Sequence, residues 1–361
     1  MNLKHFIYFT ICCFVFTSCN STDDGNGSIE TPEYHEYISA VDISSWPEIE
    51  TSNPTFYDAY GNTVGFITQL KSNGVNTVRL RLWVNPLSKH SGFDEVKTFA
   101  TQLRTAGFKI WLSVHYSDNW ADPEHQNIPE SWQGLSFSEL KEEVGIYTKM
   151  IVQELQPEYI QIGNEINLGF LLPQGDINTN YTQFKSLMET AITSVRNYSS
   201  ESKIIFHFAG LEHADWFFGQ VNDLDYDIIG LSYYPIWHGK SLTTLQNTMA
   251  SLSSKYDKDI VIAETAYPFT LDWNDWTNNI VGQDNQLITT YPATPEGQLD
   301  FVNKIKTIAK DVERGIGFCY WGAELIAWKG DEATDGSPWE NQAIFDFNNK
   351  ALPVLEAFLV E

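Results

Sequence analysis

Hydrophobic and polar residues alternate along the chain with two different periods. Short runs rich in β-branched and aromatic residues, typical of buried strands, recur from about residue 38 onward. Between them lie longer segments whose apolar residues repeat at helical spacing, and several end in Gly or a basic residue, as helix C-termini do. The strand runs are ISAVDIS, GVNTVRLRLWV, FKIWLSVHY, EYIQIGN, SKIIFHFAG, YDIIGLSYY, DIVIAETAY and GIGFCYWGA. The helical segments are residues 63–74, 93–107, 137–155, 181–198, 242–256 and 295–315.

This order of elements predicts an α/β fold, a (β/α)₈ TIM barrel in a single domain. Eight strands separated by helices in about 320 residues favour a closed barrel over an open doubly wound sheet. No GxGxxG or Walker-type loop supports the open alternative. Since no second shift in composition marks a boundary, the predicted catalytic domain spans residues 37–361.

The first 18 residues differ from the rest. Lys4 and His5 precede the apolar run FIYFTICCFVFTS, which suits the core of a signal peptide and is short for a bilayer span. The ending FTSC resembles the lipobox of bacterial lipoproteins, in which Cys19 would become the lipidated first residue of the mature chain. An ordinary secretory signal cleaved nearby is the alternative.

Residues 19–36 are polar and rich in Gly, Ser and Asp, which predicts a flexible tether. Acidic residues after Cys19 also resemble the surface-export signal of some Gram-negative lipoproteins, so we expect an outer-membrane lipoprotein facing the cell surface. Cys319 is the one cysteine of the predicted domain, and its apolar neighbours indicate a buried small hydrophobe and no disulfide.

Charge and aromatic content narrow the class of partner. The chain has 22 basic and 47 acidic residues, which opposes binding to nucleic acid and to anionic lipid. The 12 Trp and 17 Tyr residues offer flat apolar faces with a polar edge, which suit sugar rings.

Two carboxylates each end a strongly apolar strand. Glu165 follows YIQIGN on the fourth strand, and Glu264 follows DIVIA on the seventh. Because a TIM barrel gathers its chemistry at the C-terminal ends of its strands, we expect both in one pocket. Two acids flanking a bond are what glycoside hydrolysis needs. A gap of about 5 to 5.5 Å means retention of configuration and a wider one inversion, and the sequence leaves both open.

Other polar residues are expected at the same face. Arg79 could keep a carboxylate ionised, Asn164 could bind a sugar hydroxyl beside the reacting carbon, and Tyr234 could donate to Glu264. The remaining strand ends carry Asp42, His115, His207, Tyr233, Trp321 and Glu324. A metallohydrolase or a serine hydrolase is less well supported, because no HExxH, CxxC or GxSxG motif occurs.

Six motifs along the chain resemble those of a known family. The motifs GVNTVRLRLWVNP, VHYSDNWADPEHQNIPESW, IQIGNEINLGFLLPQGD, GLSYYPIW, VIAETAYP and FCYWGAELIAW resemble glycoside hydrolase family 53, the endo-β-1,4-galactanases. The resemblance covers nearly all of the chain from about Asp42. It implies that Glu165 is the acid/base and Glu264 the nucleophile of a retaining mechanism.

The same resemblance implies further roles. Arg79 would contact the nucleophile, Asn164 would bind the 2-hydroxyl, and Trp321 would be the aromatic platform after the eighth strand. His115 and Trp120 would line the cleft. The implied partners are β-1,4-galactan, a neutral side chain of pectin, and galacto-oligosaccharides. No cofactor is required for the chemistry, and we expect a monomer.

The resemblance also implies a possible structural calcium site. Bacterial relatives join the loops after strands seven and eight through a calcium ion held by alternating Asp and Asn ligands, a Ser and a further acid. The corresponding oxygen ligands are Asp272, Asn274, Asn278, Ser337 and Glu340. Trp276 occupies a position where another ligand is expected, so a metal-free polar loop is the alternative, with Trp273 and Trp276 extending the sugar cleft.

Two other functions stay open from the sequence. A surface lipoprotein could bind polysaccharide without cleaving it, although such a binder has no need of the acid pair. A relative from the same barrel clan could act on mannan or cellulose, because it would differ only in its subsite contacts.

Overall fold

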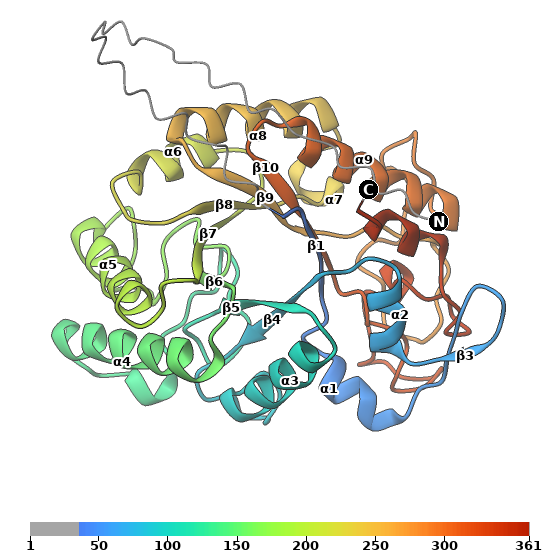
Figure 1. Ribbon diagram of the computed structural model, residues 1–361, viewed down its shortest axis with the longest axis horizontal. Helices are drawn as coiled ribbons and strands as arrows, with labels where there is room; N and C mark the ends of the chain where they lie inside the picture. The colour runs from blue at the N-terminus through green and yellow to red at the C-terminus, as the bar shows by residue number, and fades with distance from the viewer. Residues whose placement is uncertain (1–35, 361) are drawn as a thin grey trace, which may run out of the picture. The chain divides into compact units, whose positions relative to one another are not determined.

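All eight predicted strands form, and they close into a parallel barrel. The computed structural model describes residues 36–360, so the predicted signal peptide and the lipidation site at Cys19 lie outside the described residues. The barrel order is β1, β4, β5, β6, β7, β8, β9, β10 and back to β1 (Figure 1). The strands are β1 (Ile38–Asp42), β4 (Thr77–Leu82), β5 (Lys109–Val114), β6 (Tyr159–Ile162), β7 (Lys203–Ala209), β8 (Ile228–Ser232), β9 (Asp259–Thr265) and β10 (Gly315–Trp321). This confirms the predicted TIM barrel.

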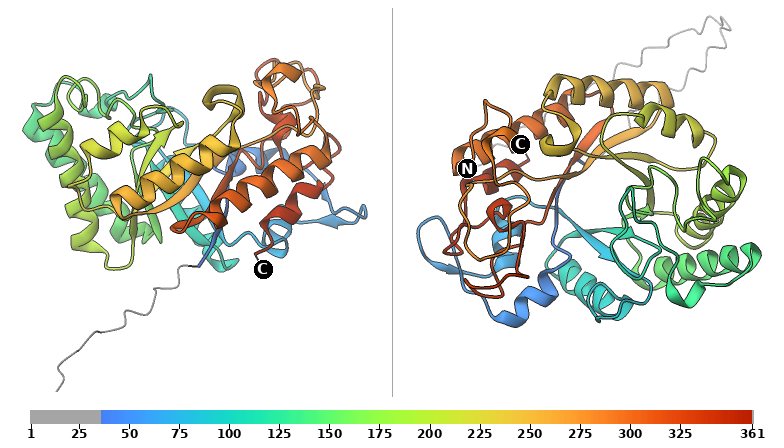
Figure 2. Two further views of the ribbon diagram at one scale, coloured as in Figure 1. Left: turned by 90° about the horizontal axis from the view of Figure 1, so that it is seen from above. Right: turned by 180° about the vertical axis from the view of Figure 1, so that it is seen from behind.

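Helices surround the barrel on its outer side, as Figure 2 shows from two further directions. They are α1 (Trp46–Ile49), α2 (Phe66–Ser72), α3 (Phe93–Thr105), α4 (Phe137–Leu155), α5 (Tyr181–Tyr198), α6 (Ala214–Gln220), α7 (Pro235–His238), α8 (Leu242–Tyr256) and α9 (Pro295–Asp311). The 3₁₀ helix Pro353–Phe358 packs against α9 after the last strand. Shorter 3₁₀ turns are Glu50–Ser52, Glu130–Trp132, Asp284–Gln286 and Glu340–Gln342.

One predicted helix begins later than expected. The helical pattern was expected from residue 63, but Thr63–Val64 is strand β3, paired antiparallel with β2 (Phe56–Tyr57). Gly65 is in an extended conformation at the N-cap of α2, with φ −78° and ψ 136°, and this lets the chain turn from the hairpin into the helix.

The barrel interior is apolar toward the N-terminal ends of the strands and polar toward their C-terminal ends. Because side chains alternate along a strand, Trp111, Val261 and Cys319 face inward and pack in a buried apolar cluster with residues of β1, β7, β8 and β10. Cys319 is free and buried, as expected. Ser113, two residues after Trp111 on β5, and Arg79 on β4 are also buried, but in a polar network. The fold therefore delivers polar groups to one end of a packed core.

Within the described part of the chain, no helix is both long and apolar enough to cross a membrane.

Candidate active site

A cleft of about 920 Å³ opens at the C-terminal ends of the strands. Glu165, which follows β6, and Glu264, which lies on β9, both line it. A carboxylate oxygen of Glu165 lies within 4.8 Å of a carboxylate oxygen of Glu264. The structure thus brings the two predicted carboxylates together across one pocket.

The backbone around Glu165 is unusual. Gly163 has φ 79°, and a Cβ on it would lie 2.4 Å from Cγ2 of Ile166, so only glycine fits there. Glu165 itself has φ 48°, which is rare for a residue with a side chain and often marks a functional site. Hydrogen bonds from the backbone N–H of Glu165 to His207 Nδ1 (3.3 Å) and of Ile166 to the His207 carbonyl (3.0 Å) hold this turn.

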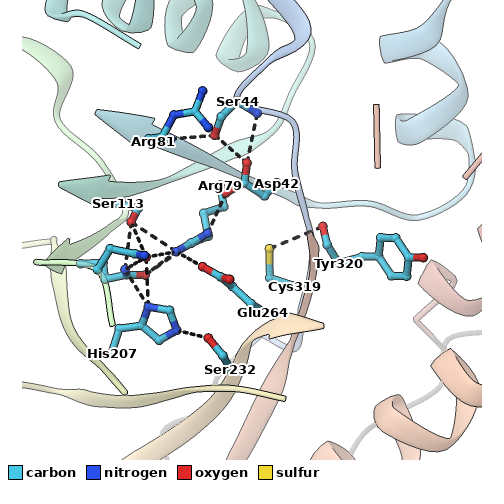
Figure 3. Close-up of polar contacts among 12 residues, drawn as sticks. Asp42, Ser44, Arg79, Arg81, Ser113, His207, Ser232, Glu264, Cys319 and Tyr320 are labelled. Atoms are coloured by element: carbon cyan, nitrogen blue, oxygen red, sulfur yellow. Dashed lines mark hydrogen bonds and ion pairs between the residues drawn. The ribbon is translucent and has the colours of Figure 1, made fainter. Parts of the chain in front are cut away.

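Arg79 links the nucleophile candidate to two other strands. Its guanidinium contacts Asp42 Oδ2 at 2.7 Å and Glu264 Oε1 at 2.8 Å, and all three side chains are nearly inaccessible to solvent. It also donates to Asn164 Oδ1 at 2.8 Å. Figure 3 shows the Arg79 side chain pointing to Glu264. The predicted contact of Arg79 with Glu264 is therefore present.

Asn164 is held at both ends of its amide. Its Nδ2 donates to the carbonyl of Ala121 at 2.8 Å, while its Oδ1 accepts from Arg79 and from Gln161 Nε2 at 3.0 Å. Gln161, on β6, also donates to Ser113 and accepts from Arg79. Asn164 therefore presents a fixed amide edge to the cleft that it lines.

The two carboxyl groups differ in their electrostatic surroundings. Burial raises the pKa of Glu165, and the negative charge of Glu264 raises it further. Burial also raises the pKa of Glu264, but the guanidinium of Arg79 and the hydroxyl of Tyr234, which donates to Glu264 Oε2 at 3.0 Å, oppose that rise. The pair therefore favours a protonated Glu165 beside an ionised Glu264.

His115 lines the cleft as a neutral imidazole. Its pKa is lowered by burial and then by the nearby guanidinium groups of Arg81 and Arg79. The Nδ1 atom accepts from the backbone N–H of Ala121 at 3.1 Å, which leaves Nε2 as the protonated nitrogen and a donor.

The predicted Trp120 and Trp321 belong to a longer aromatic row. Their ring centroids are 6.0 Å apart, Trp339 lies 4.7 Å beyond Trp321, and Trp237 lies 6.0 Å beyond Trp339. All four line the cleft. On the other side, Arg81 stacks on Trp120 with 4.0 Å between its guanidinium carbon and the ring. Trp237 and Trp339 were not predicted, although each follows a strand that ends at this face.

The five predicted calcium ligands differ in exposure, since Ser337 and Glu340 are buried and Asp272 and Asn278 are exposed. Glu340 is buried, and its Oε1 accepts from the backbone N–H groups of Asn274 (2.6 Å) and Asp275 (3.2 Å). The Ser337 hydroxyl donates to the Leu325 carbonyl. Asp272 and Asn278 are exposed, and no hydrogen bond among the described residues joins them to Glu340.

Asp275 is buried between the loops that follow β9 and β10. It accepts from the backbone N–H of Thr277 at 2.6 Å and of Ser337 at 3.4 Å. The expected donors are hard oxygen ligands, and the calcium site stays a prediction. Backbone hydrogen bonds to Asp275 and Glu340 connect the loops after β9 and β10.

Comparison with known proteins identifies the family. The model of Glycosyl hydrolase family 53 matches residues 38–358. The chain belongs to this family. In this family 53 chain, Glu165 follows the fourth barrel strand and Glu264 lies near the end of the seventh.

Relatives and solved structures support the same family 53 assignment. The chain is 34% identical to an arabinogalactan endo-β-1,4-galactanase of Cellvibrio japonicus, with 89% of this chain and 90% of that protein covered. It is 31% identical to an endo-β-1,4-galactanase of Bacillus subtilis, with coverage of 90% and 85%. The fold matches a family 53 catalytic domain of Ignisphaera aggregans with a TM-score of 0.84 and 36% identity, covering 90% of this chain and 95% of that one. A fungal β-1,4-galactanase structure matches with a TM-score of 0.77 and 28% identity, covering 90% and 99%.

Proposed function

We propose that this family 53 chain is an endo-β-1,4-galactanase that cleaves the galactan side chains of pectin with retention of anomeric configuration. The observation that carries the mechanism is the gap of at most 4.8 Å between the nearest oxygens of Glu165 and Glu264. Such a gap supports the roughly 5 Å separation of retaining enzymes over the wider separation, about 6.5 to 9.5 Å, of inverting ones.

In the first step, an oxygen of Glu264 attacks the anomeric carbon and forms a glycosyl ester. Glu165 transfers its proton to the glycosidic oxygen, so the leaving sugar departs as an alcohol. The contacts from Arg79 and Tyr234 keep Glu264 ionised for the attack.

In the second step, Glu165 acts as a base. It takes a proton from a water molecule, whose oxygen attacks the anomeric carbon and displaces Glu264. Both steps pass through an oxocarbenium-like state, in which a hydrogen bond from the fixed Asn164 amide to the 2-hydroxyl becomes stronger.

The choice of galactan rests on the names of the relatives and on the cleft. The row of four tryptophans is longer than one sugar ring, which supports binding within a chain and hence endo-action. The acids Asp122 and Glu124 line the cleft as well, and negative charge there disfavours the anionic backbone of pectin.

Incubation of residues 36–361 with a panel of polysaccharides tests this proposal. We expect galacto-oligosaccharides from linear β-1,4-galactan, and no reducing ends from mannan, cellulose or polygalacturonate. Cleavage of mannan or cellulose in preference to galactan would favour the alternative of a clan relative with another substrate. Binding of galactan without any release of reducing ends would favour a non-catalytic module.

We also propose that Cys19 carries the lipid that anchors the enzyme at the cell surface. The lipobox-like FTSC and the acidic residues that follow it support this location. Metabolic labelling with a fatty acid should mark the wild-type chain and not Cys19→Ser, which should be released from the membrane fraction. Equal labelling of both chains would contradict the anchor.

A further inference from the structure

Among the described residues, the Ser232 hydroxyl is the hydrogen-bond partner of the Glu165 carboxylate, and the mechanism above gives it no role. The Ser232 hydroxyl, at the end of β8, lies 2.5 Å from Glu165 Oε1. His207, on β7, places Nε2 at 2.9 Å from the same hydroxyl oxygen. Figure 3 shows the imidazole and Ser232 side by side beneath the site. The three groups come from successive strands of the barrel.

The direction of these hydrogen bonds follows from Gln161. Its side-chain nitrogen lies 3.0 Å from the carbonyl of Gly163, while its oxygen accepts from Nε of Arg79 at 3.3 Å. Because a carbonyl only accepts and a guanidinium only donates, the orientation of the Gln161 amide is determined.

The backbone N–H of Glu165 donates to His207 Nδ1 at 3.3 Å, and Gln161 Nε2 and Asn164 Oδ1 lie 3.0 Å and 3.2 Å from the same atom. A backbone amide only donates, so Nδ1 is its acceptor. Nδ1 therefore has no proton, and Nε2 has one. The His207 Nε2–H donates to Ser232 Oγ, and the single hydroxyl proton of Ser232 points to Glu165 Oε1.

His207 is suited to keep this state at every working pH. It is fully buried, and burial followed by the charge of Arg79 lowers the pKa of its imidazole. A second proton on Nδ1 would face the N–H donors of Gln161 and Glu165. The imidazole therefore stays neutral, and its role is to orient Ser232.

We propose that Ser232 and His207 are positioning residues for the acid/base Glu165. This inference rests on the proposed retaining mechanism. With Oε1 held by Ser232, the transferable proton is placed on Oε2, for which the described residues provide no partner and which is free to face the glycosidic oxygen. After the proton leaves, the same hydroxyl stabilises the carboxylate that must act as base.

The Ser232 hydroxyl is one of several groups that set the pKa of Glu165. Glu264 and Asp122 raise its pKa, while Arg79 and the Ser232 hydroxyl lower it. The phenol of Tyr234 and the imidazoles of His207 and His238 are uncharged there, since burial moves their pKa values away from neutrality. Removing the hydroxyl of Ser232 therefore moves the pKa of Glu165 further upward.

The first test reads the tautomer and does not depend on activity. The ¹⁵N chemical shifts of selectively labelled His207 in the wild-type enzyme should show a protonated Nε2 and an unprotonated Nδ1. The opposite tautomer would overturn the inference whether or not galactan is the substrate.

The second test uses Ser232→Ala with Ser232→Thr as the conservative variant. We expect kcat on galactan to fall about tenfold in Ser232→Ala with KM nearly unchanged, and the basic limb of kcat/KM to move to higher pH. Ser232→Thr should restore both. Ser39→Ala removes another buried strand hydroxyl, which donates to the Phe358 carbonyl, and should leave the pH profile unchanged.

An unchanged basic limb in a folded, active Ser232→Ala enzyme would overturn the positioning role. A wild-type enzyme that cleaves neither galactan nor an aryl β-galactobioside would instead refute the proposed function.

Discussion

At the scale of single residues, the two carboxyl groups are made different by their partners. Both oxygens of Glu264 accept hydrogen bonds, from Arg79 and from Tyr234. Among residues 36–360, the carboxylate of Glu165 accepts a hydrogen bond from the Ser232 hydroxyl alone, and it faces the charge of Glu264. The environment thus separates a nucleophile from an acid without any difference in side-chain type.

Replacement of Glu165 should separate the two chemical steps. Glu165→Ala should lower kcat on galactan by about 10²- to 10⁴-fold, because the natural leaving group needs the proton. An aryl galactobioside with an acidic phenol needs no such help, so its glycosyl-enzyme should accumulate. Added azide should restore turnover and give a β-galactosyl azide. An α-azide, or no effect of azide, would contradict the assignment of Glu165.

The catalytic residues could be predicted from sequence because each ends an apolar strand, and strand ends share one face in a barrel. Gln161, within β6, and Ser232, at the end of β8, could not be predicted, because the sequence does not reveal which side chain each one contacts across the barrel. Their positions depend on the register of β6 against β5 and of β8 against β9. A strand interior that contains an amide, such as YIQI, is the only sequence signal for Gln161.

At the scale of elements, loops after three different strands build one aromatic surface. Trp120 follows β5 and Trp237 follows β8. Trp321 is the last residue of β10, and Trp339 lies in the segment after it. The sequence predicted Trp120 and Trp321 at the cleft, but the whole row depends on how the loops fold over one another.

Trp237→Ala should weaken substrate binding more than catalysis. We expect KM for long galactan to rise about 3- to 10-fold, as loss of one aromatic contact implies, with kcat little changed. Trp216→Ala provides the control, because Trp216 is similarly exposed on α6 and does not line the cleft. Equal effects of the two substitutions on KM would argue against an extended binding surface.

The loop after β10 also buries an acid that should affect stability. Burial raises the pKa of Glu324 to about 8. Its Oε1 accepts from the backbone N–H of Ser45, and its buried Oε2 has no hydrogen-bond partner among the described residues. The folded state therefore binds a proton that the unfolded state loses above about pH 4.5. Its contribution to stability is complete below about pH 4.5 and is lost progressively as the pH rises to about 8.

Glu324→Gln removes this titration. The variant should gain roughly 1 to 3 kcal/mol over the wild type between pH 5 and pH 8, measured by denaturant unfolding at several pH values. Glu356→Gln, at an exposed acid of the last 3₁₀ helix, should show no such gain. A wild-type stability that is constant over this range would contradict a buried protonated Glu324.

At the scale of the whole molecule, the barrel combines a strongly acidic surface with a catalytic centre organised around buried arginine. The excess of 47 acidic over 22 basic residues predicted a neutral or cationic partner, and the cleft shares this charge. The fold followed from the count and order of strands. The calcium site stays a prediction, since two of its five expected ligands, Asp272 and Asn278, are exposed and the neighbouring Asp275 is buried.

The central claim is that Glu165 and Glu264 act as a retaining pair on β-1,4-galactan. Proton NMR of the first minutes of hydrolysis of linear galactan observes the anomer of each new reducing end directly. We predict that the β-anomer appears first and that the α-anomer grows in later at the rate of mutarotation. Initial formation of the α-anomer, or no new reducing ends, would contradict this account.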